Sequence, residues 1–342
     1  MYYANAHSFQ QDFLYLQNFG AFGVDIFFVI SGFIIPYSAG RYKGARDGYA
    51  FLSHRFKRVN PVYYLVTLLL IITSLHSWIR DHVFPLSWHK ALKSIILLPL
   101  FDRTKYTSCI IFQAWTLSFE WFFYLLFLVT ILARTRHKER WLGSMIAALV
   151  IAGSFLQGGD YRLHFISNPI LLEFMLGVGI YWCYSRITIP KTIALALLLA
   201  GIALCIFRII KGFGDIDGAT FTANGSLSFI RFLYWGIPAG LLVAGSLFLE
   251  KKGVPGFARN NRTVALLGDS SYSLYLLNTL VFEMIASLYR RTGFFLNPDL
   301  AIFVQLALAI IAGVLFYKWV EAPLLRRLRK KDPYSISTTL FR

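Results

Sequence analysis

Long apolar runs recur along the chain and are separated by short polar segments. A helix needs about 20 mostly apolar residues to cross a hydrocarbon core about 30 Å thick, because it rises only 1.5 Å per residue. Nine runs approach this length: about 20–39, 61–79, 113–134, 142–157, 165–185, 191–210, 230–249, 264–289 and 299–319. The pattern predicts an all-α, polytopic helical bundle in a membrane. The fourth run is short, and residues 91–101 are too short to cross.

Composition strengthens this prediction. The chain is 57% hydrophobic, only 15% of its residues are charged, and its mean hydropathy is +0.57. A soluble chain has about a quarter of its residues charged, so much of this surface must face lipid. The net charge of +17 would suit nucleic acid. The basic residues fall in short segments between apolar runs, however, so the expected partner is the lipid bilayer and not nucleic acid.

The basic residues also orient the runs. If residues 40–60 lie inside, the segments assigned to the inside hold 22 Lys and Arg, against nine in those assigned to the outside. Positive residues accumulate on the cytoplasmic side of membrane proteins. The N-terminus is therefore expected outside and the C-terminus in the cytoplasm. Residues 1–331 are interpreted as one membrane-embedded domain and 332–342 as a short cytoplasmic tail.

Ionisable residues inside the apolar runs are functional candidates, because lipid penalises them. Asp25 and Glu173 lie within runs, and Glu283 lies toward the outer end of its run. Each could instead form an ion pair or cap a helix, and this structural interpretation is favoured for Glu173 and Glu283. Arg208 and Arg231 lie near outer ends, where their side chains are expected to reach toward the membrane surface.

Glu120 is the stronger catalytic candidate. It lies about seven residues inside its run, in the segment AWTLSFEWFFYLL. Trp115, Ser118 and Tyr124 add polar groups to the same aromatic helix, which favours a functional role over simple pairing.

Two arginines precede the second run. Arg55 and Arg58 are three positions apart, so they share a face of a helical turn. Pro61 follows and is expected in the first turn of the spanning helix. Two guanidinium groups at a cytoplasmic mouth suit phosphate binding, although most such pairs are ordinary membrane anchors.

Other motifs are weaker. His7 stands in the N-terminal stretch, where an exposed loop histidine is the plainer interpretation, and the other histidines fall in loops or near the ends of runs. Ser271, Tyr275 and Asn278 form one polar stripe, of a kind that more often joins helices than binds a ligand. The three cysteines form no CxxC, so no metal site is expected. HExxH, P-loop and GxSxG motifs are absent.

Five blocks in order resemble the signatures of the membrane-bound acyltransferase 3 family. They are GVDIFFVISGFII, HRFKRVNPVYYL, WTLSFEWFFYLL, LGDSSYSLYLLN and VEAPLLRRLRK, and they extend over nearly the whole chain. The resemblance implies an O-acyltransferase that moves an acyl group, most often acetyl, from cytoplasmic acyl-CoA to a carbohydrate or glycolipid acceptor. It implies no permanently bound cofactor and a bacterial inner-membrane location.

The resemblance also assigns residues. His7 matches a histidine essential in the family, Glu120 matches the acidic residue of the WSLSxE block, and Arg55 and Arg58 match the RxxR pair. We therefore expect His7, Glu120 and Asp25 to be catalytic, with the two arginines binding acyl-CoA phosphates. Supporting roles are expected for Ser31, Trp115, Ser118, Tyr124, Tyr275 and Asn278.

The chain departs from the family pattern in two places. Many members have histidine where Asn278 stands, and a family arginine about eleven residues before His7 would fall before Met1. The chain is thus interpreted as nine spans of a ten-span acyltransferase. A secondary transporter is the main alternative, although the duplicated halves common in transporters are not evident. A structural or sensing protein, or a family member without activity, remains open.

Overall fold

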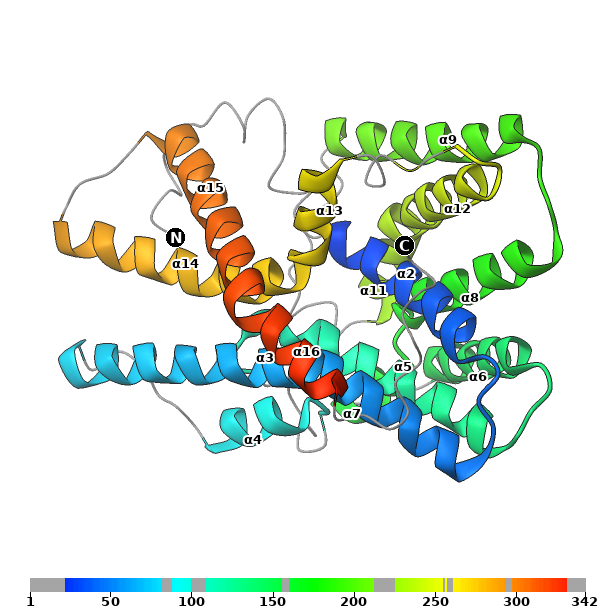
Figure 1. The fold of residues 1–342 in the computed structure, drawn as a ribbon, viewed down its shortest axis with the longest axis horizontal. Helices are drawn as coiled ribbons and strands as arrows, with labels where there is room; N and C mark the ends of the chain where they lie inside the picture. Colours follow the sequence, from blue (N-terminus) through cyan, green and yellow to red (C-terminus); the bar gives the residue numbers. More distant parts are fainter. Residues whose placement is uncertain are drawn as a thin grey trace. The chain divides into compact units, whose positions relative to one another are not determined.

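The computed structural model describes residues 22–81, 88–99, 109–155, 160–211, 225–254, 256, 261–292 and 297–330. Their regular structure is helical, which confirms the all-α prediction (Figure 1). The first half holds α2 (Phe22–Ala39), α3 (Gly44–Asp81), α4 (Trp88–Ile96), η2 (Phe112–Ala114), α5 (Trp115–Leu132), α6 (Lys138–Ser154), α7 (Tyr161–Ile166) and α8 (Leu171–Arg186). The second half holds α9 (Lys191–Ile210), α11 (Gly225–Arg231), η3 (Phe232–Gly236), α12 (Ile237–Lys251), α13 (Arg262–Asp269), α14 (Ser271–Thr292), α15 (Pro298–Phe316), η4 (Tyr317–Glu321) and α16 (Ala322–Lys330).

Seven helical segments among the described residues are long and apolar enough to cross a membrane, so the chain is a polytopic membrane protein. They are Phe22–Ala39, Gly44–Thr73, Phe112–Leu132, Tyr161–Arg186, Lys191–Ile210, Gly225–Lys251 and Leu300–Leu328. Two further runs predicted to span are also helical. α6 has 17 residues, which is short. α14 has 22, but polar residues such as Asn278 and Glu283 lower its hydropathy.

Two compact units make up the chain. The first, unit 1, comprises residues 1–45, 87–109 and 114–256, and the second, unit 2, comprises 46–86, 110–113 and 257–342. The single domain expected over 1–331 stays a prediction. The tail expected at 332–342 lies outside the described residues.

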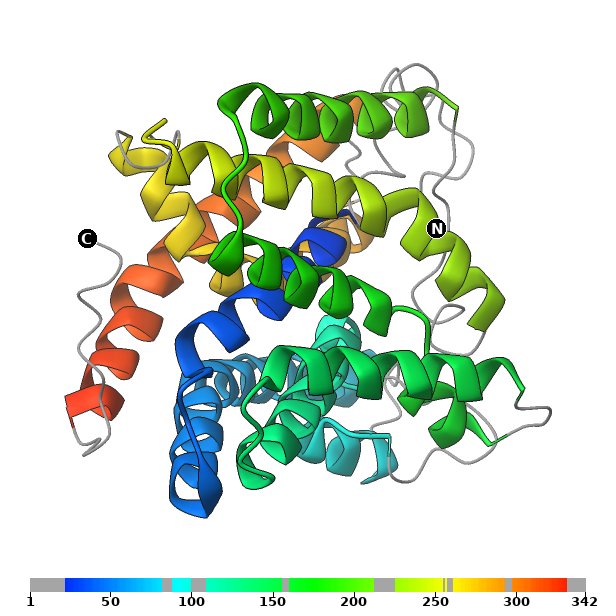
Figure 2. The same cartoon turned by 90° about the vertical axis from the view of Figure 1, so that its right-hand side faces the viewer.

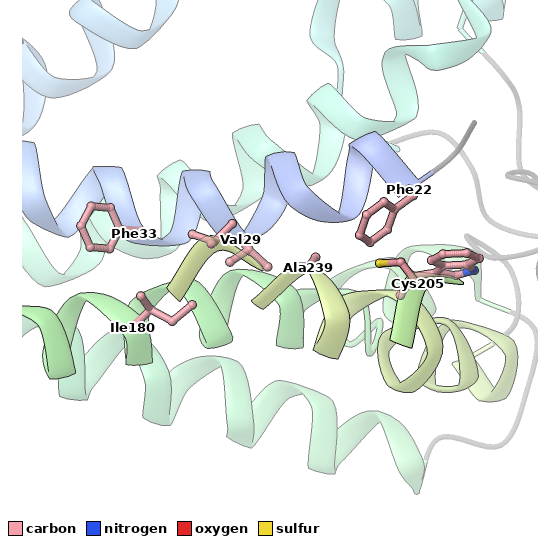
Figure 3. Packing of buried hydrophobic residues seen from close by; sticks show 8 residues of the cluster. Phe22, Val29, Phe33, Ile180, Cys205 and Ala239 are labelled. Carbon is pink, nitrogen blue, oxygen red and sulfur yellow. The ribbon is translucent and has the colours of Figure 1, made fainter. Parts of the chain in front are cut away.

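Unit 1 is built around α2, which packs against α8 and α12, while α9 packs along α12. Figure 2 shows α9 and α12 side by side near its top. A buried cluster joins them and includes Phe22 and Val29 of α2, Ile180 of α8, Cys205 of α9 and Ala239 of α12 (Figure 3). The core of unit 1 is thus made by residues from four helices far apart in sequence.

Glycines bring α2 and α8 into close contact. A Cβ atom on Gly32 would lie 2.1 Å from the carbonyl oxygen of Phe174, and one on Gly177 would lie 2.1 Å from that of Val29. Small residues at a crossing let two membrane helices approach closely. This approach matters for the site, because Asp25 lies on α2 and Glu173 on α8.

The helix α9 has the surface expected of a lipid-facing span. It was predicted at 191–210 and is found at Lys191–Ile210, with only 17% of its residues buried. Ile193, Leu199 and Ile206 are among its exposed apolar side chains. The other side of the helix packs on α12, where Gly201 lies against Leu242.

Unit 2 differs from the sequence prediction in two helices. α3 begins at Gly44 rather than near 61, so Pro61 lies inside the helix and not in its first turn. The preceding residues include good helix formers such as Ala, Arg and Lys, and these extend the helix beyond the apolar run. The run 264–289 is not one helix either: α13 ends at Asp269 and α14 starts at Ser271. α14 packs against α15.

Candidate active site

Glu120 lies on α5 with its carboxylate buried. Its side chain is 6% exposed, and the Tyr124 hydroxyl donates a hydrogen bond to Glu120 Oε1. The two residues are four positions apart, so the helix itself brings them together. Ser118 and Trp115 are also buried on this helix, and Ser118 donates to the carbonyl of Ala114 over 3.3 Å. The polar groups that the sequence assigned to α5 are therefore held inside unit 1.

Asp25 forms a bidentate ion pair with Arg231. Arg231 Nε donates to Asp25 Oδ1 over 2.8 Å, and Arg231 Nη2 donates to Asp25 Oδ2 over 2.7 Å. Asp25 is 0% exposed and Arg231 is 2% exposed. The expectation that Arg231 reaches toward the membrane surface is therefore wrong. The carboxylate of Asp25 attracts its guanidinium inward, and the guanidinium carbon also lies 6.0 Å from the centroid of the Trp115 ring.

Glu173 joins this pair from α8. Its side chain is 0% exposed, and neither carboxylate oxygen accepts a hydrogen bond from a donor in the described part of the chain. It lies within hydrogen-bonding reach of Asp25 and interacts electrostatically with Arg231. The structure therefore gathers two carboxylates and one guanidinium from α2, α8 and α11. Glu283, by contrast, is exposed on α14.

Arg208, the other arginine near an outer end, packs over an aromatic ring. Its guanidinium carbon lies 3.8 Å from the centroid of Tyr234, the middle residue of η3. η3 is a π-helical stretch that follows Arg231 directly. Such stretches within α-helices often occur at functional sites.

A neutral polar cluster lies in unit 2 at the start of the predicted third span. Gln113 Nε2 donates to Asn278 Oδ1 over 2.9 Å, and Thr279 Oγ1 donates to Gln113 Oε1 over 2.6 Å. The Tyr275 hydroxyl donates to the carbonyl of Gln113 over 3.1 Å. The polar stripe of α14 therefore joins this helix to η2. Sequence reasoning missed Gln113, because it lies 165 positions from Asn278 and no local pattern marks it.

Arg55 and Arg58 lie on α3, also in unit 2, and both precede Pro61 on the continuous helix. The Arg55 guanidinium carbon lies 5.7 Å from the centroid of the Phe51 ring. Arg58 is exposed and interacts electrostatically with Glu321, a buried residue that accepts a hydrogen bond from Ser273. Glu321 ends η4, a second π-helical stretch, and was not singled out from the sequence.

Two predicted site residues remain to be placed. Ser31 is buried on α2, six positions after Asp25. His7 lies outside the described residues. The catalytic roles of His7, Glu120 and Asp25 stay predictions.

Unit 1 buries three carboxylates, groups that are suited to acid–base chemistry. Glu120 with Tyr124, and Asp25 with Glu173 and Arg231, place three buried carboxylates on α2, α5 and α8. Carboxylates in such surroundings can orient a histidine or hold a proton. Among the described residues, no group of three or more His, Cys, Asp or Glu could hold a metal ion.

Comparison with known proteins gives concordant matches. Residues 1–319 match the profile of the acyltransferase 3 family, described as an acyltransferase domain. The chain is 30% identical over 318 residues to the exopolysaccharide production protein ExoZ of Rhizobium meliloti (strain 1021), which covers 91% of this chain and 92% of that protein. It is 25% identical to the acyltransferase MdmB of Streptomyces mycarofaciens, covering 94% of this chain and 84% of that protein.

A putative O-acetyltransferase of Staphylococcus aureus (strain COL) is also 25% identical, over 331 residues. The match covers 89% of this chain but only 52% of that protein, so the chain spans about half of its length. No solved structure matches the chain.

Proposed function

Because the chain belongs to the acyltransferase 3 family, we propose that it moves an acyl group from cytoplasmic acyl-CoA to a hydroxyl of an envelope or extracellular carbohydrate. The chain is an integral membrane acyltransferase. The observation that carries the proposal is the family match over 1–319, together with relatives named for exopolysaccharide production and O-acetylation. Acetyl-CoA is the proposed donor, and the bacterial inner membrane, with a cytoplasmic C-terminus, is the proposed location.

In the reaction, the oxygen of the acceptor hydroxyl bonds to the acyl carbon and the thioester C–S bond breaks. The hydroxyl proton ends on the CoA sulfur, so the products are the ester and free CoA thiol. His7 takes this proton, or carries the acyl group between donor and acceptor. Glu120 orients the imidazole and stabilises its charged form, and Tyr124 fixes the Glu120 carboxylate through its hydrogen bond.

Arg55 and Arg58 are proposed to bind the CoA phosphates. They share a face of α3, and their guanidinium groups can each hold a phosphate through paired hydrogen bonds. The positive-inside distribution supports a cytoplasmic position for them. Asp25 and Glu120 would then lie in the outer half, where an envelope glycan arrives, and the pantetheine arm would carry the thioester between the helices.

Acyl transfer from radiolabelled acetyl-CoA to envelope glycan tests the proposal in membranes that contain the full chain. We expect His7→Ala and Glu120→Gln each to lower kcat at least tenfold, because each removes a group from the proposed proton path. Full activity in both variants contradicts the assignment. Substrate uptake by vesicles without acyl transfer would instead identify a transporter.

The donor site has a separate test. Arg55→Ala and Arg58→Ala are each expected to raise KM for acetyl-CoA about ten- to a hundredfold while kcat changes little, because removing a charged contact costs about 1.5–3 kcal/mol. Lys57→Ala is the matched control, since it removes one positive charge from a different face of the same helix segment. An equal rise in KM for all three variants contradicts specific phosphate binding.

A further inference from the structure

The cluster of Asp25, Glu173 and Arg231 contains one negative charge too many for its surroundings. With both carboxylates ionised, its net charge would be −1 at a place where the three side chains are 0%, 0% and 2% exposed. An isolated charge in such an interior is strongly disfavoured, and a carboxyl group takes up a proton instead. Arg231 uses Nε and Nη2 on Asp25, which leaves Glu173 as the carboxylate without a paired donor.

The position of Glu173 beside Asp25 also indicates that one proton is bound between the two carboxyl groups. Glu173 lies within hydrogen-bonding reach of Asp25, yet neither of its oxygens has a donor among the described residues. Two ionised carboxylates are both acceptors and repel each other at this separation. The contact becomes favourable when one proton lies between them, as in other carboxyl pairs that share a proton.

We infer that Asp25 and Glu173 share one proton beside Arg231, and that Glu173 is the positioning residue that holds the Asp25–Arg231 pair in place for acyl transfer. The role in acyl transfer rests on the proposed function, whereas the shared proton does not. Protonated Glu173 donates to Asp25, Asp25 holds Arg231, and Arg231 lies beside the Trp115 ring on the helix that carries Glu120. Glu173 thus acts through its neighbours and need not touch the substrate.

The other carboxylates and Tyr234, on elements near α8, interact with groups outside the cluster or lie away from it, and Cys205 interacts with Asp25 only electrostatically. Glu120 of α5 accepts from Tyr124, and Glu139 of α6 pairs with Arg186 at the opposite end of α8. The ring of Tyr234 in η3 lies under Arg208. Glu250 lies at the far end of α12, and Cys205 of α9 feels the charge of Asp25. The proton therefore belongs to the Asp25–Glu173 pair.

The close approach of the backbone supports the same arrangement. A Cβ atom on Gly236, the last residue of η3, would lie 3.0 Å from Glu173 Cγ and 3.3 Å from Glu173 Oε1. The glycine leaves room for the Glu173 side chain beside η3, the stretch that directly follows Arg231. The backbone of η3 at Gly236 therefore helps to hold the Glu173 side chain in its position.

Three measurements that compare the wild-type full chain with Glu173 variants test the inference: infrared spectra, activity and thermal unfolding. Infrared spectra of the purified protein at neutral pH should contain the carbonyl-stretch band of a protonated carboxylic acid that is lost in Glu173→Gln. Glu283→Gln, which changes an exposed glutamate, should leave the band intact. Identical spectra for wild type and Glu173→Gln overturn the inference, whether or not acyl transfer is detected.

Activity gives the second readout. Glu173→Ala should lower kcat about tenfold, and Glu173→Gln should restore most of that loss, because an amide can still donate to Asp25. Wild-type kcat should fall at alkaline pH as the shared proton leaves, whereas Glu173→Gln should keep its rate there. Superimposable pH profiles for wild type and Glu173→Gln overturn the inference.

Thermal unfolding in detergent is the third readout and does not require activity. The wild-type Tm should fall as pH rises from about 4 upward, because an unfolded glutamate loses the proton that the folded Asp25–Glu173 pair keeps. The Glu173→Gln Tm should lack this component. If wild type shows no acyl transfer while the infrared band and Tm behave as expected, the proposed function fails and the shared proton stands. Parallel Tm curves for the two proteins overturn the shared proton.

Discussion

At the scale of single residues, the ion pair between Asp25 and Arg231 is bidentate and buried in unit 1. Removing one partner of a buried pair leaves the other charge without compensation and costs about 3–5 kcal/mol of folding free energy. We expect Arg231→Leu to destabilise the protein by this amount, measured by thermal or denaturant unfolding in detergent.

The matched control is Arg186→Leu. Arg186 Nη2 lies 3.0 Å from Glu139 Oε1, but the Arg186 side chain is 36% exposed. A pair of this kind contributes only about 0–1 kcal/mol, because solvent screens it. Equal losses for Arg231→Leu and Arg186→Leu would mean that the Asp25–Arg231 pair is not shielded as the structure indicates. The double variant Asp25→Leu with Arg231→Leu should recover part of the loss, since no unpaired charge remains.

The hydrogen bond between Tyr124 and Glu120 leads to a second prediction at this scale. Tyr124→Phe keeps the ring and removes the donor, so the buried Glu120 carboxylate loses this hydrogen bond, at a cost of about 1.5–3 kcal/mol for a bond to a charged group. Tm should fall, and kcat should fall with it if Glu120 orients a catalytic histidine. Tyr49→Phe is the control, because Tyr49 is 72% exposed. An unchanged Tm in Tyr124→Phe would argue against this hydrogen bond.

The limits of sequence prediction are clearest for these residues. Glu120 and Tyr124 are four positions apart on one helix, so their pairing follows from helical geometry. Asp25 and Arg231 are 206 positions apart, and the sequence marks both as ionisable groups in apolar runs without showing that they meet. Glu173 was assigned a pairing role, and its partners could be identified only after α2, α8 and α11 were packed together.

At the scale of elements, boundaries set by charge and proline were easier to predict than those inside polar stretches. α9 runs from Lys191 to Ile210 as expected, because Pro190 precedes it and a very apolar stretch follows. The start of α3 was missed, since residues 44–60 are polar yet form helix. The break at Ser270 between α13 and α14 was missed too, because the polar residues GDSSYS around it were included in one predicted span.

The crossing of α2 and α8 gives the prediction for this scale. Gly177→Ala would place a Cβ atom 2.1 Å from the carbonyl oxygen of Val29, so the helices must separate. Overpacking of this kind costs about 1–3 kcal/mol. The separation should also displace Glu173 from Asp25, so the infrared band assigned to the shared proton should weaken along with the Tm.

Gly179→Ala, on the same helix as Gly177, is the control for this crossing. A Cβ atom at Gly179 would have no neighbouring atom within 4 Å. Alanine is favoured over glycine inside a helix by about 0.5–1 kcal/mol, so this variant should be neutral or slightly stabilised. Should both variants behave alike, the close contact of α2 and α8 is not what positions the carboxylates.

At the scale of the whole molecule, the family match, the helical architecture and the distribution of charge agree. Seven segments suited to crossing a membrane lie within a chain whose residues 1–319 match one acyltransferase family. The exposed apolar surface of α9 and of the α15–α16 segment, each only 17% buried, is the surface that lipid would cover. The apolar side chains that these helices leave exposed are therefore the ones that favour insertion into a membrane.

The orientation of the molecule gives the last prediction. Lys211 follows α9 and should lie outside, whereas Val254 follows α12 and should lie in the cytoplasm, because the basic residues concentrate on the latter side. Lys211 is exposed and Val254 is 38% exposed, so a cysteine at either position can react. In a chain whose own three cysteines are replaced by alanine, Lys211→Cys should react with a membrane-impermeant maleimide on intact bacterial spheroplasts. Val254→Cys should react only after permeabilisation. The reverse pattern would place the C-terminus outside and would separate Arg55 and Arg58 from cytoplasmic acyl-CoA, so the donor assignment would fail with the topology.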